Sequence, residues 1–323
     1  MKFGAINILT LACLLVPTYT EVATAETINV RPLEKVKTGK APQFSSLSSD
    51  GRLLYVTNYA SNEISAVDVI SRKNVATFYG GYEPLGITAS PSGDKIFVAN
   101  RSNGLVKVIS TTTHRVLDDI KVGGRPTNLI VSPSGLHIYV ANWGKGKYGK
   151  IDIIDTSTHR ILAEVQIGIA PIAGTVSLLG DFVYMACAGS NDIWVLDTNE
   201  RKILKQIPVG VKPNGVAISP DGYTLYVTNG STNDLSVLDL LDLEETQRIR
   251  VGSKPFSIAI DGKGRIFIVE SGDNSVAILD SDLKKIGRFS VGQKPVDIEL
   301  SLDGRLAFVT SEKSNRLHVF EIH

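Results

Sequence analysis

Short apolar runs alternate with polar breaks along this chain, and the same order of segments returns seven times. In the copy that begins at Lys212, an apolar run over 215–219 leads into the turn Ser219-Pro-Asp-Gly222. A second run ends at 229, a third covers 235–239, and a fourth ends in an Ile-x-Val-Gly tail. Short runs rich in β-branched and aromatic residues, bounded by Pro, Gly and Asp, predict strands. Each copy is therefore expected to form four strands, here called a to d.

A proline opens each copy and sets the length of the repeat. These anchor prolines are Pro42, Pro84, Pro126, Pro171, Pro213, Pro255 and Pro295, with gaps of 42, 42, 45, 42, 42 and 40 residues. A strand-type repeat of this length predicts a ring of four-stranded blades, because one unit cannot bury both faces of its sheet alone. The expected fold is all-β, a seven-bladed β-propeller that occupies residues 26–323 as one domain.

The last copy is incomplete, since the chain stops at His323 after strand c. A segment with the character of strand d stands at the other end of the chain, at 26–39. We expect 26–39 to pair with the last copy and close the ring. A ring closed in this way needs no second chain, so we expect a monomer able to fold alone.

Residues 1–25 do not follow the pattern of the repeats. Lys2 precedes an apolar run over 6–16, and Ala23-Thr-Ala25 fits a small-residue cleavage site. This pattern predicts a secretory signal peptide cleaved after Ala25, and a periplasmic or secreted protein. The apolar run is too short to span a bilayer, so no membrane span is expected. Cys187 would be the single cysteine left, and we expect it to be a small buried hydrophobe.

Strand b carries a recurring tetrapeptide. It reads Tyr-Val-Thr-Asn at 55–58 and 226–229, Phe-Val-Ala-Asn at 97–100 and Tyr-Val-Ala-Asn at 139–142. These residues resemble the YVTN family of β-propeller repeats, seen in bacterial exported proteins and archaeal surface proteins. The resemblance covers nearly all of residues 26–323 and is specific for fold, not for activity. Similar propellers in that family accompany periplasmic redox systems as accessory subunits, so the resemblance also implies a redox partner as one option.

One loop breaks the repeat. Strand direction places the d–a and b–c loops on one face of the ring, the top face, and three residues are inserted there in the b–c loop of the third copy. A basic, glycine-rich loop with aromatic residues suits contact with an anion, a sugar or a protein partner. A solvated loop whose tryptophan packs on its neighbour is the alternative. The binding candidates in this loop, 142–150, are Trp143, Lys145, Lys147 and Tyr148.

Basic residues also recur next to the anchor prolines. They are Arg125, Lys212, Lys254 and Lys294, with Lys40 as a shifted fifth, whereas Glu83 and Ala170 take the position in the other two copies. Repetition around the ring would bring these side chains to one rim and focus positive potential, although the net charge of the chain is only +1. The alternative is that a long polar side chain simply suits an exposed position. Arg101 and Tyr59 are expected to add to the same surface.

Acidic residues near the expected channel are scarcer. Asp297 and Glu299 stand on strand a of the last copy, where other copies have Gly, Ala, Ser or Thr. We expect them to pair with the lysine rim, with catalysis as the weaker alternative. No Cys-x-x-Cys-His motif, no Gly-x-Ser-x-Gly motif and no histidine cluster is present, so neither a cofactor nor a metal is predicted.

These features rank three functions. The first is an exported, non-catalytic binding or scaffold protein that holds a periplasmic or cell-surface protein partner, or an anionic small ligand, on its top face. The second is a hydrolase or lyase that acts at the channel mouth, by resemblance to propeller lactonases, which use acids and histidines there. Asp297 and Glu299 would be the acids, and a histidine partner is missing. The third is single-stranded nucleic-acid binding through basic and aromatic side chains, as one branch of the family is thought to do.

Overall fold

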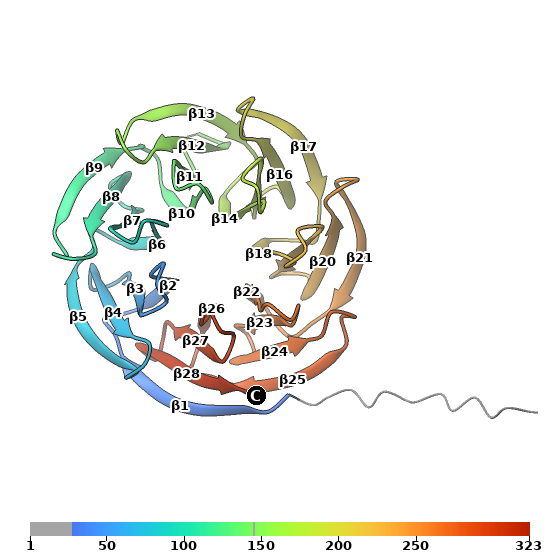
Figure 1. Cartoon of the computed structure of the whole chain (residues 1–323). Coiled ribbons are helices and arrows are strands. Elements are labelled where there is room, and N and C mark those ends of the chain that lie inside the picture. Colours follow the sequence, from blue (N-terminus) through green and yellow to red (C-terminus); the bar gives the residue numbers. More distant parts are fainter. Residues whose placement is uncertain (1–27, 145) are drawn as a thin grey trace, which may run out of the picture.

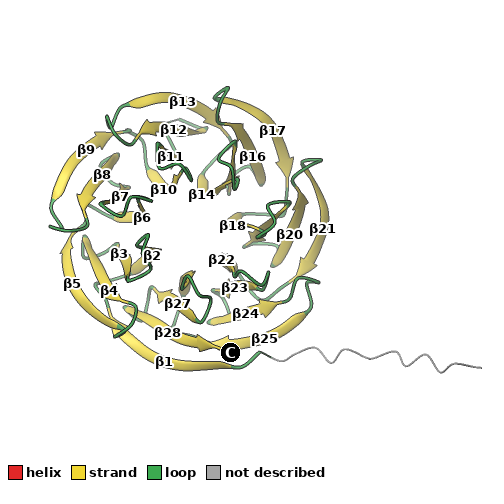
Figure 2. Ribbon diagram, viewed as in Figure 1, coloured by secondary structure: helices red, strands yellow, loops and turns green. Residues whose placement is uncertain are grey.

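Seven four-stranded antiparallel sheets form a ring around a central channel (Figure 1). The computed structural model describes residues 28–144 and 146–323, so the expected signal peptide, its cleavage after Ala25 and Lys145 lie outside the described residues. Every regular element in the described part of the chain is a strand (Figure 2). The prediction of an all-β, seven-bladed β-propeller is confirmed.

Each of the first six blades begins at an anchor proline and adds its strands in chain order. Blades 1 and 2 comprise β2 (Pro42–Leu47), β3 (Leu53–Asn58), β4 (Glu63–Asp68), β5 (Lys73–Tyr79), β6 (Pro84–Ala89), β7 (Lys95–Asn100), β8 (Leu105–Ser110) and β9 (Val116–Lys121). Blades 3 and 4 comprise β10 (Pro126–Val131), β11 (His137–Asn142), β12 (Gly149–Asp155), β13 (Ile161–Ile167), β14 (Pro171–Val176), β15 (Phe182–Cys187), β16 (Asp192–Asp197) and β17 (Lys202–Pro208). Blades 5 and 6 comprise β18 (Pro213–Ile218), β19 (Thr224–Asn229), β20 (Asp234–Asp239), β21 (Glu244–Arg250), β22 (Pro255–Ile260), β23 (Ile266–Glu270), β24 (Ser275–Leu279) and β25 (Lys285–Ser290).

Blade 7 combines the two ends of the chain. Its strands are β26 (Pro295–Leu300), β27 (Leu306–Ser311), β28 (Arg316–Ile322) and, as the outermost strand, β1 (Val30–Lys37). The last two pair antiparallel, with Val30 opposite Ile322 and Lys37 opposite Arg316, and they lie side by side in Figure 1. The expected closure of the ring by the N-terminal strand is therefore confirmed.

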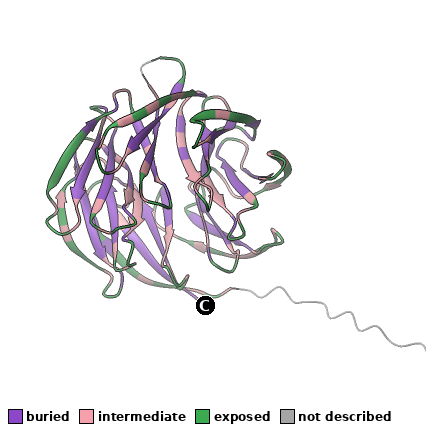
Figure 3. Cartoon of the chain, turned by 45° about the horizontal axis from the view of Figure 1, so that its top comes forward, coloured by how far each residue is buried: buried purple, intermediate pink, exposed green. Residues whose placement is uncertain are grey.

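The hydrophobic core lies between blades. One cluster joins Phe97 and Val108 of blade 2 to Leu129 and Ile138 of blade 3, and similar clusters fill the other interfaces. The two middle strands of a blade are buried almost throughout, and the innermost strand is half-buried where it lines the channel. The outermost strand exposes much of its surface (Figure 3). Cys187 is fully buried in one of these clusters, and burial raises the pKa of its thiol. It behaves as the small hydrophobe that the sequence indicates.

Asparagines fasten the top-face loops of neighbouring blades together. In six of the seven blades, all but blade 3, the residue before the anchor proline adopts a left-handed conformation, with φ of 49° at Lys254 and 52° at Lys294. Its N–H donates to an asparagine of the preceding blade, at 2.8 Å to Asn233 Oδ1 and 2.8 Å to Asn274 Oδ1, respectively. The same bond recurs at Asn62–Glu83, Asn191–Lys212 and Asn315–Ala41. These bonds fix the d–a loops around the channel mouth.

Candidate functional site

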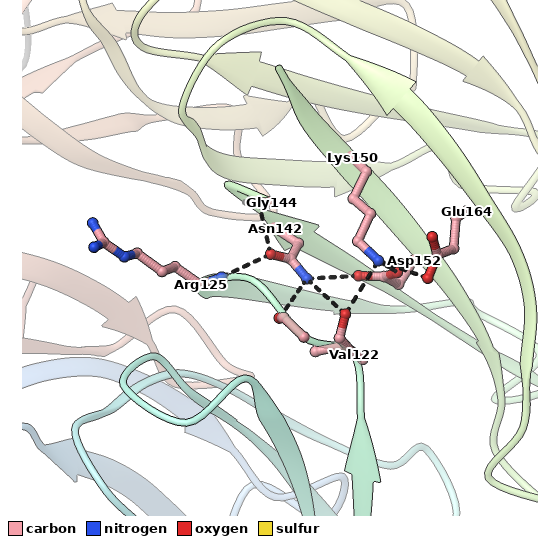
Figure 4. Close-up of polar contacts among 8 residues, drawn as sticks. Val122, Arg125, Asn142, Gly144, Lys150, Asp152 and Glu164 are labelled. Atoms are coloured by element: carbon pink, nitrogen blue, oxygen red, sulfur yellow. Dashed lines mark hydrogen bonds and ion pairs between the residues drawn. The ribbon is translucent and has the colours of Figure 1, made fainter. Parts of the chain in front are cut away.

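The long loop of blade 3 stands on a buried polar base (Figure 4). Asn142, at the end of β11, lies opposite Lys150 of β12 in the sheet register. The Asn142 amide donates to Asp152 Oδ2 at 2.9 Å and to the Gly123 carbonyl at 3.0 Å. Its Oδ1 accepts the N–H groups of Arg125, at 2.9 Å, and of Gly144, at 3.0 Å. One amide therefore ties the loop to the connection that arrives from blade 2.

The Lys150 ammonium group forms its contacts within this polar base. Its Nζ lies 2.6 Å from Asp152 Oδ1, 2.7 Å from Glu164 Oε1 and 3.1 Å from the Val122 carbonyl. Three acceptors satisfy the three N–H groups of an ammonium. Burial raises the pKa of Asp152 to about 6, against the opposing effect of Lys150 and Asn142. The base of the loop is thus fixed, and only residues between 143 and 149 are left to meet a ligand.

Trp143 lies on the inner side of the loop, towards the channel. Its indole Nε1 donates to the Pro171 carbonyl at 2.8 Å, and the guanidinium carbon of Arg101 lies 4.8 Å from the centre of its ring. Tyr59, Arg101 and Trp143 occupy the same position in blades 1, 2 and 3, directly after strand b. Blades 4 to 7 have Ala188, Gly230, Ser271 and Glu312 at that position. Aromatic and basic side chains therefore gather on the top face of blades 1 to 3.

A hollow of about 350 Å³ opens beside this stack, and we call it the inner hollow. It is lined by Glu83, Arg101, Ser102, Gly124 and Arg125. Within the described residues, neither guanidinium group forms an ion pair with a carboxylate, and Arg101 Nε is buried without a hydrogen-bond partner. The inner hollow is thus lined by two arginines and by one carboxylate, that of Glu83.

Tyr59 borders the same group of side chains. Burial raises the pKa of its hydroxyl, Glu83 adds to the rise, and Arg101 opposes it. The hydroxyl therefore stays neutral at physiological pH and remains a hydrogen-bond donor. Its chemistry suits positioning a ligand beside Arg101.

A second hollow, of about 660 Å³, lies on the other side of the loop, and we call it the outer hollow. Its lining residues are Val122, Gly123, Gly124, Gly144, Gly146, Lys147, Tyr148, Gly149, Lys150, Glu164 and Gln166. Tyr148 is 50% exposed, and Lys147 Nζ lies 5.5 Å from the centre of its ring. The loop therefore lines the outer hollow with Tyr148, while Trp143 contacts Arg101, which lines the inner hollow.

The rim lysines do not join this site. Lys212 and Lys254 are exposed on blades 5 and 6, whereas Lys294 on blade 7 pairs with Glu312 at 2.6 Å. Of the predicted rim, only Arg125 lies beside Arg101 and Trp143. The basic residues nearest the anchor prolines are thus distributed around the ring, and the inner hollow gathers charge from blades 2 and 3 alone.

The expectation that Asp297 pairs with the rim lysines is wrong. Asp297 lies in β26, which lines the channel, where its Oδ2 accepts the Ser45 N–H at 2.8 Å and the Ser45 hydroxyl at 2.7 Å. Its Oδ1 accepts the Ser257 hydroxyl at 2.9 Å. Strand a lines the channel, away from the loops that carry the lysines. Asp297 therefore accepts hydrogen bonds from serines of the adjoining blades and does not pair with a lysine.

Glu299 lines the same channel cavity, of about 210 Å³, and likewise forms no ion pair with a lysine in the described chain. Burial raises the pKa of Glu299 to about 8, and the nearby charge of Asp297 adds to the rise. The side chain is therefore protonated at neutral pH.

Sequence reasoning missed two parts of the site. Glu83 was noted only as an exception to the basic rim, and it proves to line the inner hollow. The doublet Gly123-Gly124 was not singled out, although both residues are left-handed, with φ of 68° and 56°. Two adjacent glycines before an anchor proline were the signal that could have drawn attention to this connection.

The part of the chain that the structure describes contains no helix long and apolar enough to cross a membrane. It also contains no group of three or more His, Cys, Asp or Glu side chains placed to hold a metal ion.

A closed ring of seven four-stranded blades defines the class of this protein, the seven-bladed β-propellers. Among solved structures, hydrazine synthase of Kuenenia stuttgartiensis is similar to the chain, with a TM-score of 0.81 and 22% sequence identity over 87% of this chain and 95% of that chain. At this identity the likeness shows the fold alone. No family model matches the chain, and neither does any curated protein.

Proposed function

We propose that this protein is an exported, non-catalytic β-propeller that binds an anionic group of a partner protein or small ligand on the top face of blades 1 to 3. The observation that carries the proposal is the inner hollow, where Arg101 and Arg125 lie without carboxylate partners beside Trp143. Guanidinium groups bind carboxylates through two parallel, charge-assisted hydrogen bonds. The ligand group that this arrangement fits best is a carboxylate.

The catalytic alternative depends on Asp297 and Glu299, and their surroundings favour binding over catalysis. Asp297 accepts hydrogen bonds from Ser45 and Ser257 on both sides of its blade. Glu299 keeps its proton until about pH 8, which makes it a poor general base at neutral pH. The structural neighbour is named as an enzyme, but a shared fold does not carry an activity.

Export and family membership belong to the same proposal. The signal-like pattern of residues 1–25 supports export, and the Tyr-Val-Thr-Asn repeats support membership of the YVTN family. That family resemblance gives the proposed setting, an accessory role beside a periplasmic redox system. N-terminal sequencing of the protein recovered from its host tests export: Glu26 as the first residue supports it, and an intact Met1 contradicts it.

Fluorescence of Trp143 tests the binding proposal directly. The chain has two tryptophans, so Trp194→Phe leaves Trp143 as the single reporter. We expect citrate, a tricarboxylate, to change its emission in a saturable way. Arg101→Gln or Arg125→Gln should weaken that binding by about tenfold, because each removes a charge-assisted contact.

The matched control is Arg160→Gln, which removes an exposed arginine from the opposite face of blade 3. It should leave citrate binding unchanged. The proposal is wrong if neither citrate nor a hexaglutamate peptide gives a saturable response, or if Arg160→Gln weakens binding as much as Arg101→Gln.

A further inference from the structure

The inner and outer hollows meet over a strip of bare backbone. Both are lined by Gly124, which packs so closely on the blade 3 loop that a Cβ there would lie 2.9 Å from Gly144 Cα. Gly123 precedes it and lines the outer hollow. We call Gly123, Gly124 and Gly144 the glycine saddle. The two hollows therefore adjoin at Gly124, on the top face between blades 2 and 3, and we call them together the groove.

The backbone of the glycine saddle has an unusual conformation and is open on one side. Gly123 and Gly124 are the only two consecutive left-handed residues in the described part of the protein, a conformation that glycine adopts without steric cost. A Cβ at Gly123 would have no atom within 4 Å, so the space above it is open. Within the described residues the Gly124 N–H makes no hydrogen bond, and it is available to an acceptor on a ligand.

Charged and aromatic side chains stand at both ends of the groove. Arg101 and Arg125 occupy the inner end, and Lys147 and Tyr148 occupy the outer end. We propose that the groove binds an extended acidic polypeptide segment of a partner protein, which crosses the saddle from the outer hollow to the inner one. The proposal rests on the proposed function for its inner anchor. It adds the class of the ligand, an extended acidic polypeptide segment, and the second half of its binding site.

The chemistry along the groove favours a polypeptide over a nucleic acid. Glu83 lines the inner hollow and Glu164 the outer one, so carboxylates stand among the positive charges. Evenly spaced phosphates would meet both of them, whereas an extended polypeptide turns alternate side chains away from the groove and can place a backbone N–H beside each carboxylate. A main-chain carbonyl can also accept the Gly124 N–H, as in other sites that bind extended peptides.

Three ligands and two groove-filling variants test the assignment. In the Trp194→Phe background, we expect a blocked hexaglutamate peptide to bind about tenfold more tightly than citrate. Gly123→Asn retains the left-handed backbone, which asparagine tolerates, and puts a side chain over the saddle. Gly146→Leu fills the outer hollow, where a Cβ at Gly146 meets no atom within 4 Å. Each variant should weaken hexaglutamate by about tenfold and leave citrate unchanged.

Gly262→Leu is the matched control, since Gly262 also faces open space but lies in the a–b turn of blade 6 on the opposite face. It should bind both ligands like the parent, and all variants should melt like the parent. If citrate binds but hexaglutamate binds no more tightly, or if Gly123→Asn and Gly146→Leu leave the peptide unaffected, the groove is not a peptide site while the proposed function stands. Tighter binding of a hexadeoxythymidylate than of hexaglutamate would overturn the assignment in favour of a nucleic acid. Failure of all three ligands contradicts the proposed function itself.

Discussion

Asparagine side chains at the ends of the b–c loops hold the top face together. Asn274 accepts the Lys294 N–H and itself adopts φ of 53°, a conformation that costs most residues about 1 kcal/mol. Blade 2 shows what happens without such an asparagine, because Gly104 takes the position there. Asn142 of the following blade then accepts the Arg125 N–H instead. The bond is kept even where an asparagine of a different blade supplies the accepting oxygen.

Substitution of Asn274 separates the hydrogen bond from the backbone conformation. Asn274→Gly loses only the bond and should lower the free energy of unfolding by about 1 kcal/mol. Asn274→Ala also places a Cβ in the left-handed region, so its loss should be about 2 kcal/mol. Urea unfolding measures both. Asn103→Ala, in the exposed loop of blade 2, should be neutral; equal stability of all three variants would show that the bond does not matter.

Glu299 makes stability depend on pH in an unusual direction. Its carboxyl has a pKa of about 8 in the folded protein, against the usual 4.5 of a glutamate. The native state therefore holds this proton across a range in which the unfolded chain has lost it. Stability should fall as pH rises through that window, by at most about 1.4 kcal/mol per pH unit for one proton.

Removing this carboxyl should flatten the pH profile. The upper part of the range between pH 6.5 and 8 lies above the pKa of about 6 for Asp152 and above the ordinary pKa of 6.5 for histidine, so His318 no longer contributes there. Burial also raises the pKa of the neighbouring Asp297, and Glu299 is the carboxyl that the substitution removes from this pair. We expect urea midpoints of the parent to fall across that range, and those of Glu299→Gln to change less and exceed the parent at pH 8. Glu34→Gln, an exposed carboxyl in β1, controls for the loss of a charge. Parallel profiles for the parent and Glu299→Gln would contradict the assignment.

At the scale of single elements, the strands could be predicted well because the same pattern of apolar and polar residues occurs in each of the seven copies. The expected third strand of blade 5, 235–239, is β20 (Asp234–Asp239), and the second is β19 (Thr224–Asn229). The aspartates that close strand c behave as turn residues: Asp239 Oδ1 accepts the N–H groups of Leu241 and Asp242. The repeat period, the turn glycines and the anchor prolines depend only on residues close together in the sequence. They therefore predict strands and turns, which are formed by such residues.

The site was predicted only in part, because its contacts join different blades. The 45-residue gap identified the blade 3 loop, but no spacing rule indicates that Arg101 stacks on Trp143 of the next blade. The shared position of Tyr59, Arg101 and Trp143 after strand b was readable and would have helped. The partners of Asp297 were wrongly predicted. They are Ser45 and Ser257, which lie at the same level of the channel on the adjoining blades and are distant from Asp297 in the sequence.

At the scale of the whole molecule, stability depends on closing the ring. The strand β1 hydrogen-bonds β28, while its Val36 packs in a cluster with Leu317 of blade 7 and Val67 of blade 1. Loss of β1 therefore opens the edge of blade 7 and uncovers part of its interface with blade 1. The strand thus adds to the contacts that join blades 1 and 7 directly, such as the Ser45–Asp297 and Ala41–Asn315 hydrogen bonds.

Truncation at the N-terminus tests this closure. A chain that starts at Gly39 should lose on the order of 3–5 kcal/mol of unfolding free energy relative to one that starts at Glu26, because Val36 and its neighbours are no longer buried. Urea unfolding measures the difference. A peptide of residues 26–38 added in trans should recover part of the loss, since the freed edge of β28 can pair with an added strand. A scrambled peptide should not. Equal midpoints for the two chains would mean that the contacts of the six complete blades hold the ring without its closing strand.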